Sequence, residues 1–315
     1  MEKIIGIQAL KKLVSLIKKA IDDTKIKCLT YYEQGQSFYM GTGNCAIRID
    51  NNCIPKNSFA GGYLSYILGD IQNSICYGKS LTASESNQAI FGFYNNRNTH
   101  DTILALGNGI RKPEGHVYSS DAFYVKTSGN TYAAGTYNTI GADYAEYFEW
   151  EDGNENSEDR IGHFVTLEGN KIRIAGPNDD IIGAISGMSS IIGNAYEDTW
   201  NGMYERDIYG RLIYENVEVE TETIENGKKI IKTVTERRRK INPNYNPELE
   251  YTPRSQRKEW AVVGLLGQIV LIDDGTCVSG GKCTVTDGGI ATTGNKYRVI
   301  KRLDDSHILI LANFI

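Results

Sequence analysis

Two acidic side chains stand three residues apart in a segment that is otherwise rich in aromatic residues. Asp143 and Glu146 fall within residues 141–150, which also contain Tyr144, Tyr147, Phe148 and Trp150. Two carboxyl groups can divide general acid and general base work when their surroundings differ, since burial raises the pKa of a carboxyl group and hydrogen bonds to its ionised form lower it. The aromatic rings could supply dry surroundings. The same spacing also fits two surface acids beside a packed aromatic stripe, so it does not establish a catalytic site by itself.

Residues for other catalytic or metal-binding chemistry are sparse. The six cysteines form no Cys-x-x-Cys pair and the four histidines are scattered, whereas a zinc site needs clustered ligands. The acidic segment 152–158 has Ser157 where a calcium loop turns at glycine, and His163 where that loop has a bidentate glutamate. Neither a Gly-x-Ser-x-Gly elbow nor a phosphate-binding loop is present. We therefore expect no metal and no cofactor.

The composition favours a β-rich protein with a sizeable core. The 315 residues are 40% hydrophobic and include 33 glycines and 20 tyrosines but only 6 prolines, a mixture that suits short strands and tight turns better than helical bundles. The net charge of -5 argues against nucleic acid as a partner. Because no apolar run approaches the roughly 20 residues of a membrane helix, we expect no membrane insertion. Without a recognisable signal peptide, we expect the chain to fold in a cytoplasm.

An amphipathic helix is predicted over residues 3–24. Its apolar residues repeat at spacings of 3, 4, 3 and 4, as in a coiled-coil seam: Ile7, Leu10, Val14, Ile17 and Ile21. Three heptads are too few to separate a docking or oligomerisation helix from one packed on a globular core.

A loose repeat follows between residues 28 and 110. An asparagine, a small or apolar pair and a glycine recur near Asn57, Asn73 and Asn87, at offsets of 16 and 14 residues. Such a repeat is typical of a β structure with one coil per unit, in which stacking or trimerisation supplies the core. Residues 117–137 then alternate like strands around the turn residues 128–130, which predicts a hairpin.

Residues 143–315 have the composition of a compact, strand-rich domain. A hairpin is predicted around residues 167–171, and the apolar runs 181–185 and 262–272 are predicted core strands. Residues 214–240 predict a long hairpin arm that turns at Asn226-Gly227.

The two strands of this arm differ in charge. We expect an acidic strand with Glu218, Glu220 and Glu222 to pair with a basic one, at roughly 0.2–1 kcal/mol per opposite-charge pair. The arm has few apolar residues, so it is either exposed alone or reaches around a neighbouring subunit, and we favour the second.

The segment 141–150, GADYAEYFEW, resembles the signature that opens a phage autoprocessing module. That module is the intramolecular-chaperone autoproteolytic domain, a glutamic peptidase family of the preneck appendage protein type. The likeness continues through GHFVTLEGNKIRIA, SSIIGNAY, VGLLGQIV and DGGIAT, and so covers about residues 141–315. It implies a domain that trimerises a β-rich shaft and then severs itself at its own N-terminus.

The resemblance also implies the site residues. The family has an aspartate directly after the scissile bond and a glutamate three residues later, which matches Asp143 and Glu146 and places the cut between Ala142 and Asp143. We expect Glu146 to act as general base toward water, and Asp143 to polarise the Ala142 carbonyl or to protonate its own departing amine. The family often has serine at the position of Ala142, so cleavage here would need no side-chain nucleophile on that side. Splicing chemistry would need Cys, Ser or Thr at the junction.

The whole sequence therefore predicts a mainly β protein in three parts. These are a short docking or trimerisation helix (1–27), a trimeric β-rich shaft (28–142), and an α+β chaperone domain dominated by strands (143–315). The expected function is a phage tail fibre or appendage whose last domain promotes trimerisation and then cuts itself off, once, in cis or between subunits of the trimer.

The expected partners are two further copies of the chain, tail or baseplate proteins bound through the N-terminal helix, and a host cell-surface receptor. The expected location is the virion tail, after synthesis in the bacterial cytoplasm. The alternative is a non-catalytic, trimeric receptor-binding tip, in which exposed tyrosines would stack on sugars.

Overall fold

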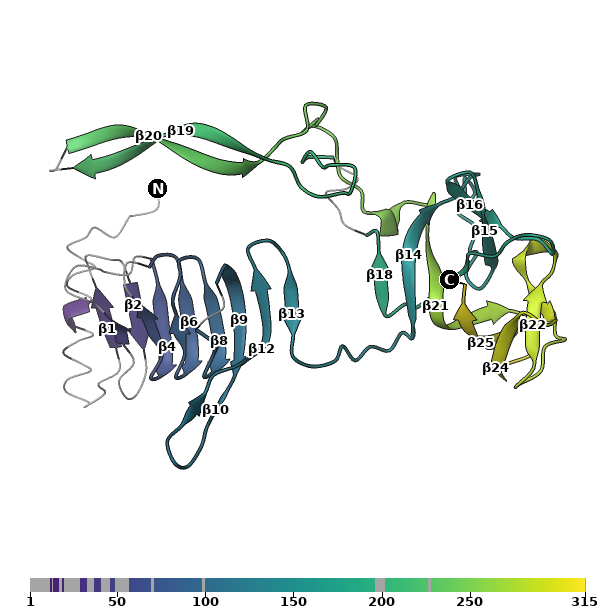
Figure 1. The fold of residues 1–315 in the computed structure, drawn as a ribbon, viewed down its shortest axis with the longest axis horizontal. Coiled ribbons are helices and arrows are strands. Elements are labelled where there is room, and N and C mark those ends of the chain that lie inside the picture. The colour runs from purple at the N-terminus through teal and green to yellow at the C-terminus, as the bar shows by residue number, and fades with distance from the viewer. Residues whose placement is uncertain are drawn as a thin grey trace. The chain divides into compact units, whose positions relative to one another are not determined.

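The computed structural model describes residues 57–68, 71–97, 100–195, 202–225 and 228–314, the backbone of three strands before residue 49, and a few helical residues near the N-terminus. Strands dominate the described residues, which confirms the mainly β fold (Figure 1). The chain divides into two compact units, Met1–Tyr137 and Asn138–Ile315.

The predicted N-terminal helix falls mostly outside the described residues. Those of residues 3–24 that are described are all helical: Lys12, Val14, Ser15, Leu16 and Lys19. The role of this helix in docking or oligomerisation stays a prediction.

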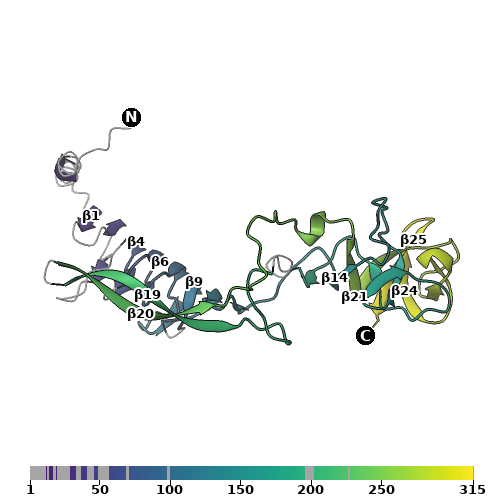
Figure 2. The same ribbon diagram turned by 90° about the horizontal axis from the view of Figure 1, so that it is seen from above.

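The first unit is a stack of short strands. Its main sheet has the order β1-β2-β4-β6-β8-β9-β12-β13, and a smaller sheet has the order β3-β5-β7. Strands β4, β6 and β9 follow one another along the stack in both views (Figures 1 and 2). The strands are β1 (Leu29–Tyr32), β2 (Ser37–Met40), β3 (Ala46–Arg48), β4 (Phe59–Tyr63), β5 (Tyr66–Leu68), β6 (Ile75–Lys79), β7 (Thr82–Ala83), β8 (Ala89–Phe93), β9 (Thr102–Asn108), β10 (Ile110–Arg111), β11 (Val117–Tyr118), β12 (Asp121–Lys126) and β13 (Thr131–Ala133).

Each unit of the predicted repeat forms one coil of this stack. Strands β4, β6, β8 and β9 pair in parallel, so that Phe59 lies beside Ile75 and Ile75 beside Ala89. The recurring asparagines turn the chain between coils with positive φ, a conformation that asparagine tolerates better than most residues. Their side chains form a ladder, in which Asn57 Nδ2 donates to Asn73 Oδ1 at 3.3 Å and Asn73 Nδ2 to Asn87 Oδ1 at 3.1 Å.

The coils enclose an apolar core. Its members, from both sheets of the stack and the segments between their strands, are Ala60, Ile67, Ile71, Cys76, Leu81, Ala83, Ile90 and Ala105. At the end of the unit, β12 and β13 pair antiparallel across the predicted turn at residues 128–130, with Val125 opposite Thr131, which confirms that hairpin.

The second unit is built on a ten-stranded sheet and a separate two-stranded ribbon. Its strands are β14 (Asp143–Glu149), β15 (Phe164–Glu168), β16 (Lys171–Ile174), β17 (Gly183–Ile185), β18 (Ile191–Gly193), β19 (Tyr214–Glu225), β20 (Lys228–Arg239), β21 (Trp260–Ile272), β22 (Lys282–Val285), β23 (Ala291–Thr293), β24 (Tyr297–Arg302) and β25 (His307–Asn313). The helical segments in the described part of this unit are two 3-10 turns, η1 (Arg254–Gln256) and η2 (Asp287–Gly289).

The first hairpin and one core strand of this unit follow the sequence prediction, whereas only Gly183–Ile185 of the predicted core strand 181–185 form a strand. β15 and β16 form a hairpin with Glu168 opposite Lys171, and β21 covers the whole predicted apolar run 262–272. β21 is the central strand, because β14, β17 and β25 all pair with it. Its residues Val263, Ile269 and Leu271 are buried.

The long arm is present, and its acidic strand pairs with the basic strand as predicted, although the three named glutamates are not directly opposite basic residues. β19 and β20 pair antiparallel over twelve residues each, and their turn at residues 226–227 lies outside the described residues. The register sets Glu218 opposite Thr235, Glu220 opposite Thr233 and Glu222 opposite Ile231. A hairpin's register is set by its turn, and in this register opposite charges meet directly where Glu215 lies opposite Arg238. Whether the arm reaches a neighbouring subunit stays a prediction.

Candidate active site

Asp143 is the first residue of β14 and is buried. β14 pairs with β18 in parallel and with β21 antiparallel, and it runs beside β21 in both views (Figures 1 and 2). The Asp143 residue is 3% exposed, and its Oδ2 atom accepts a hydrogen bond from Ser189 Oγ at 3.0 Å. Ser189 Oγ also lies 3.0 Å from Ser186 Oγ. The carboxyl group is therefore held in the protein interior by a chain of hydroxyl groups.

The peptide bond between Ala142 and Asp143 is held from two sides. On one side, Ser190 N donates to Asp143 O at 2.8 Å, and the Gly141 carbonyl accepts hydrogen bonds from Ser190 Oγ and from Thr139 Oγ1. On the other side, Gln268 N donates to Ala142 O at 3.3 Å. The bond predicted to break is thus fixed between the segment before β18 and the strand β21.

Three glycines make room for this arrangement. A Cβ atom on Gly141 would lie 2.5 Å from the carbonyl carbon of Ser189, one on Gly264 would lie 2.7 Å from Asp143 Oδ2, and one on Gly267 would lie 2.3 Å from Ala142 O. Real Cβ atoms do not approach other heavy atoms so closely. A side chain at any of the three positions would therefore displace the Ala142–Asp143 segment.

Glu146 lies on the other face of β14. Side chains alternate along a strand, and β14 alternates from buried Asp143 through exposed Tyr144 to buried Ala145. Glu146 shares the face of Tyr144, whose hydroxyl donates to Glu146 Oε1 at 2.5 Å. This hydrogen bond raises the pKa of the Tyr144 phenol above its ordinary value.

The two candidate acids are therefore not brought together within one chain. Three residues of extended strand span about 10 Å, and the two side chains point to opposite faces. In the described part of the chain no hydrogen bond joins Glu146 to Asp143 or to Ala142. The catalytic roles of Asp143 and Glu146, and the cut between Ala142 and Asp143, remain predictions.

The face that carries Glu146 is apolar and exposed. Tyr144 pairs with Ile191 of β18 and with Leu266 of β21, so the three lie side by side. They are 36%, 57% and 47% exposed, respectively. We call these three residues the Tyr144 patch. Because the Tyr144 patch lies beside the Glu146 carboxylate, a surface that packs on the patch would also exclude water from Glu146.

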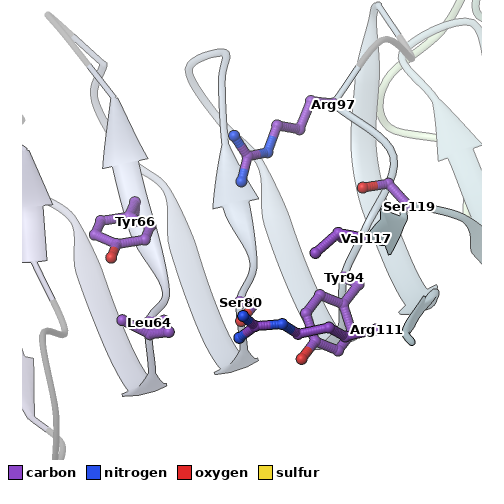
Figure 3. Close-up of a pocket in the computed structure, with 8 residues that line it drawn as sticks. All are labelled: Leu64, Tyr66, Ser80, Tyr94, Arg97, Arg111, Val117 and Ser119. Carbon is purple, nitrogen blue, oxygen red and sulfur yellow. The ribbon is translucent and has the colours of Figure 1, made fainter. Parts of the chain in front are cut away.

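A second candidate site, which the sequence did not predict, lies in the first unit. This site is a cavity of about 460 Å³. The guanidinium groups of Arg97 and Arg111 and the rings of Tyr66 and Tyr94 lie around it (Figure 3). The remaining lining residues are Leu64, Ser80, Val117 and Ser119. None of the eight is acidic, so this cavity lacks the groups for a two-carboxylate hydrolysis, and its basic and aromatic groups suit ligand binding instead.

Neither a metal cluster nor a membrane helix is found in the described ranges. No three His, Cys, Asp or Glu side chains there are grouped to hold an ion, and no helix there is long and apolar enough to span a bilayer.

Residues 89–304 match the family model described as Peptidase_G2, IMC autoproteolytic cleavage domain. The chain belongs to this family. It therefore carries a self-cleaving peptidase domain, as the sequence predicted. The match covers more than half of the chain and includes the whole arrangement around Ala142 and Asp143.

Similar proteins come from Bacillus phages. The chain is 39% identical to the pre-neck appendage protein of Bacillus phage B103, over 61% of this chain and 19% of that protein. It is 38% identical to the pre-neck appendage protein of Bacillus phage phi29, over 55% of this chain and 17% of that protein. The crystal structure of the pre-mature bacteriophage phi29 gene product 12 matches 82% of this chain and 31% of its own, with 25% identity and a TM-score of 0.55. The chain thus spans about a fifth of the length of the curated relatives it matches.

Sequence reasoning missed the groups that hold the scissile segment. Ser189 and Ser190 are separated from Asp143 by 46 and 47 positions, and Gln268 by far more. One signal was available, because Gly264 and Gly267 interrupt an apolar core strand, and glycine inside a strand often marks a close approach of another backbone.

Proposed function

We propose that this chain is the C-terminal part of a bacteriophage tail appendage, and that its domain 143–315 promotes trimerisation and then cuts the bond between Ala142 and Asp143. The observation that carries the proposal is a buried aspartate immediately after a peptide bond that is fixed from both sides. The pre-neck appendage proteins to which the chain is similar support the assignment to an appendage of the virion tail.

The proposed reaction is a hydrolysis that uses water and two carboxyl groups. The carboxylate of Glu146 takes a proton from water, whose oxygen adds to the carbonyl carbon of Ala142. The C–N bond then breaks, and the amine of Asp143 takes a proton from the carboxyl group beside it. The new carboxylic acid returns a proton to the Asp143 side chain, so the products are a carboxylate at Ala142, a free amine at Asp143 and a protonated Glu146. A single turnover within about an hour needs a barrier near 22 kcal/mol, which is a modest demand on a preorganised site.

We infer that Glu146 acts on the scissile bond of a neighbouring subunit. A general base must come within hydrogen-bond reach of the attacking water, and about 10 Å of strand separates Glu146 from Asp143 in its own chain. A second subunit packed on the Tyr144 patch would bury its apolar side chains and remove water from Glu146 in the same step. Cleavage would then follow from assembly, because the catalytic group is brought to the bond only when subunits meet.

The remaining parts of the chain fit this scheme. The coils of the stack pair strands only 14 to 16 residues apart, but intertwining of three such chains would add non-local contacts, which form slowly and leave strand edges open to wrong pairing. A domain that holds three chains in register and then leaves suits such a shaft. The helix at 1–27 would attach the shaft to tail or baseplate proteins. The division of the chain by contacts, between Tyr137 and Asn138, lies a few residues before the proposed cut.

Cleavage should depend on protein concentration if subunits supply the site to one another. Chain refolded from denaturant at a series of concentrations should release fragments faster as concentration rises, in step with the trimer seen by size-exclusion chromatography. Trimer that is assembled first and diluted afterwards is the control, and its rate should not change. A rate that is constant across concentrations at which the chain elutes as a monomer would contradict cleavage between subunits.

The cavity of the first unit favours a second function, in which the shaft binds a host-surface molecule. Its tyrosine rings can stack on sugars, and its two arginines can pair with anionic groups. A chain that assembles but stays intact on a denaturing gel, and that binds a surface glycan with loss of binding in Arg97→Ala, would favour this function over self-cleavage.

A further inference from the structure

The backbone N–H of Gln268 points at the oxygen that gains negative charge when the Ala142–Asp143 bond is attacked. We infer that this N–H is the oxyanion donor of the self-cleavage site and that Gly267 is the residue that positions it. The inference rests on the proposed function, since it concerns the same bond. When water adds to the carbonyl carbon of Ala142, the π electrons of that carbonyl move to its oxygen, and Gln268 N is the group that already donates to this oxygen.

The length of this hydrogen bond suits a group that acts on the transition state. The N–O distance is 3.3 Å, longer than the 2.9–3.0 Å that is usual between neutral backbone groups. Hydrogen bonds to an anionic oxygen are shorter and stronger than those to a neutral carbonyl. The contact would therefore tighten as charge develops, and only interactions that strengthen in this way accelerate the chemical step.

Gly267 allows this approach in two ways. Its φ of +121° lies in the region that favours glycine, and a Cβ atom there would sit 2.3 Å from Ala142 O. The register between β14 and β21 also shifts here, because Tyr144 pairs with Leu266 but Ala145 pairs with Gly264. Such bulges re-aim backbone groups and are frequent next to active sites.

The opposite side of the segment is fixed as well. The Gly141 carbonyl accepts hydrogen bonds from Ser190 and Thr139, and Gly141 packs against the backbone of Met188 and Ser189. The scissile carbonyl therefore cannot move away from Gln268 without breaking these contacts. Ser190 and Thr139 are positioning residues in this scheme, because they hold the bond against its donor and do not touch the reacting atoms.

Gly267→Ala tests the positioning role. The added methyl group should push the Ala142 carbonyl from Gln268 N and slow cleavage by about 100-fold, the effect of losing one oxyanion donor. The matched control is Gly280→Ala, because Gly280 also has positive φ (+76°) but has no heavy atom within 4 Å of its Cβ position. The control should cut at the wild-type rate. Trimer formation and the melting temperature show whether either variant has lost the fold.

An amide-to-ester exchange at position 268 tests the donor without adding a side chain. An α-hydroxy acid in place of Gln268, incorporated by codon suppression, replaces the N–H by an oxygen atom and keeps the shape of the strand. We expect the same cut, about 100-fold slower. An ester variant that cuts at the wild-type rate would overturn the inference, even if Gly267→Ala fails to fold. A wild-type chain that assembles into a trimer but is never cut would instead overturn the proposed function, so the two failures are distinguishable.

Discussion

Replacing Glu146 by glutamine is expected to abolish fragment formation and to leave assembly intact. Glutamine keeps the size of the side chain, and its amide oxygen can still accept the hydrogen bond from Tyr144. It cannot take a proton from water, and loss of a general base typically costs about 10²- to 10⁴-fold in rate. Asp143→Asn should have a similar effect, because its amide cannot supply the proton that the leaving amine needs. A denaturing gel over time measures cleavage, and size-exclusion chromatography measures assembly.

Glu168→Gln is the control for these two variants. Glu168 ends β15, pairs with Arg173 on the surface and has no contact with the scissile segment. The variant should cut at the wild-type rate. If Glu146→Gln cut as fast as this control, Glu146 would not be the base, and the search for one would turn to the groups around Ser189.

Mixing the two inactive variants should restore cleavage of one of them. In a trimer of both chains, the Glu146→Gln chain keeps an intact scissile bond and Asp143, and a neighbouring Asp143→Asn chain supplies an intact Glu146. The Glu146→Gln chain should therefore be cut. If each site uses one specified neighbour around a threefold axis, about half of the Glu146→Gln chains in an equal mixture should be cut. Tags of different length on the two chains identify which one gives fragments on a gel.

Each variant assembled alone is the control for the mixture and should stay intact. The outcome that excludes cleavage between subunits is a mixed trimer, verified by co-purification through both tags, in which neither chain is cut. Glu146 would then have to act on its own chain, and β14 would have to distort to bring it there.

The elements that could be predicted from the sequence are those with local causes. The hairpins at residues 128–130 and 167–171 follow from turn residues next to one another in the chain. The coils of the first unit follow from the repeat of Asn57, Asn73 and Asn87, because similar turns at offsets of 16 and 14 residues bring successive strands side by side. The twelve-residue strands of the long arm also follow from local pattern.

The contacts that form the site join residues that lie far apart in the sequence, so the sequence alone did not predict them. Ser189 meets Asp143 only because β18 pairs in parallel with β14, and Gln268 meets Ala142 only because β21 pairs with the same strand. One feature of the site was within reach of the sequence. Once residues 143–149 are taken as a strand, an odd separation puts Asp143 and Glu146 on opposite faces. Counting residue pairs outward from a two-residue turn at 226–227 likewise gives the observed register of the arm, whereas the charge pattern alone does not give it.

The most direct measurement is the intact mass of the fragments from fully assembled protein, together with the N-terminal sequence of the larger, C-terminal fragment. We predict two species, residues 1–142 and residues 143–315, with one water molecule added in total and Asp143 as the new N-terminus. Cleavage at any other bond, or a trimer in which the chain keeps the full mass of 315 residues, would contradict a cut made at the bond beside the buried aspartate.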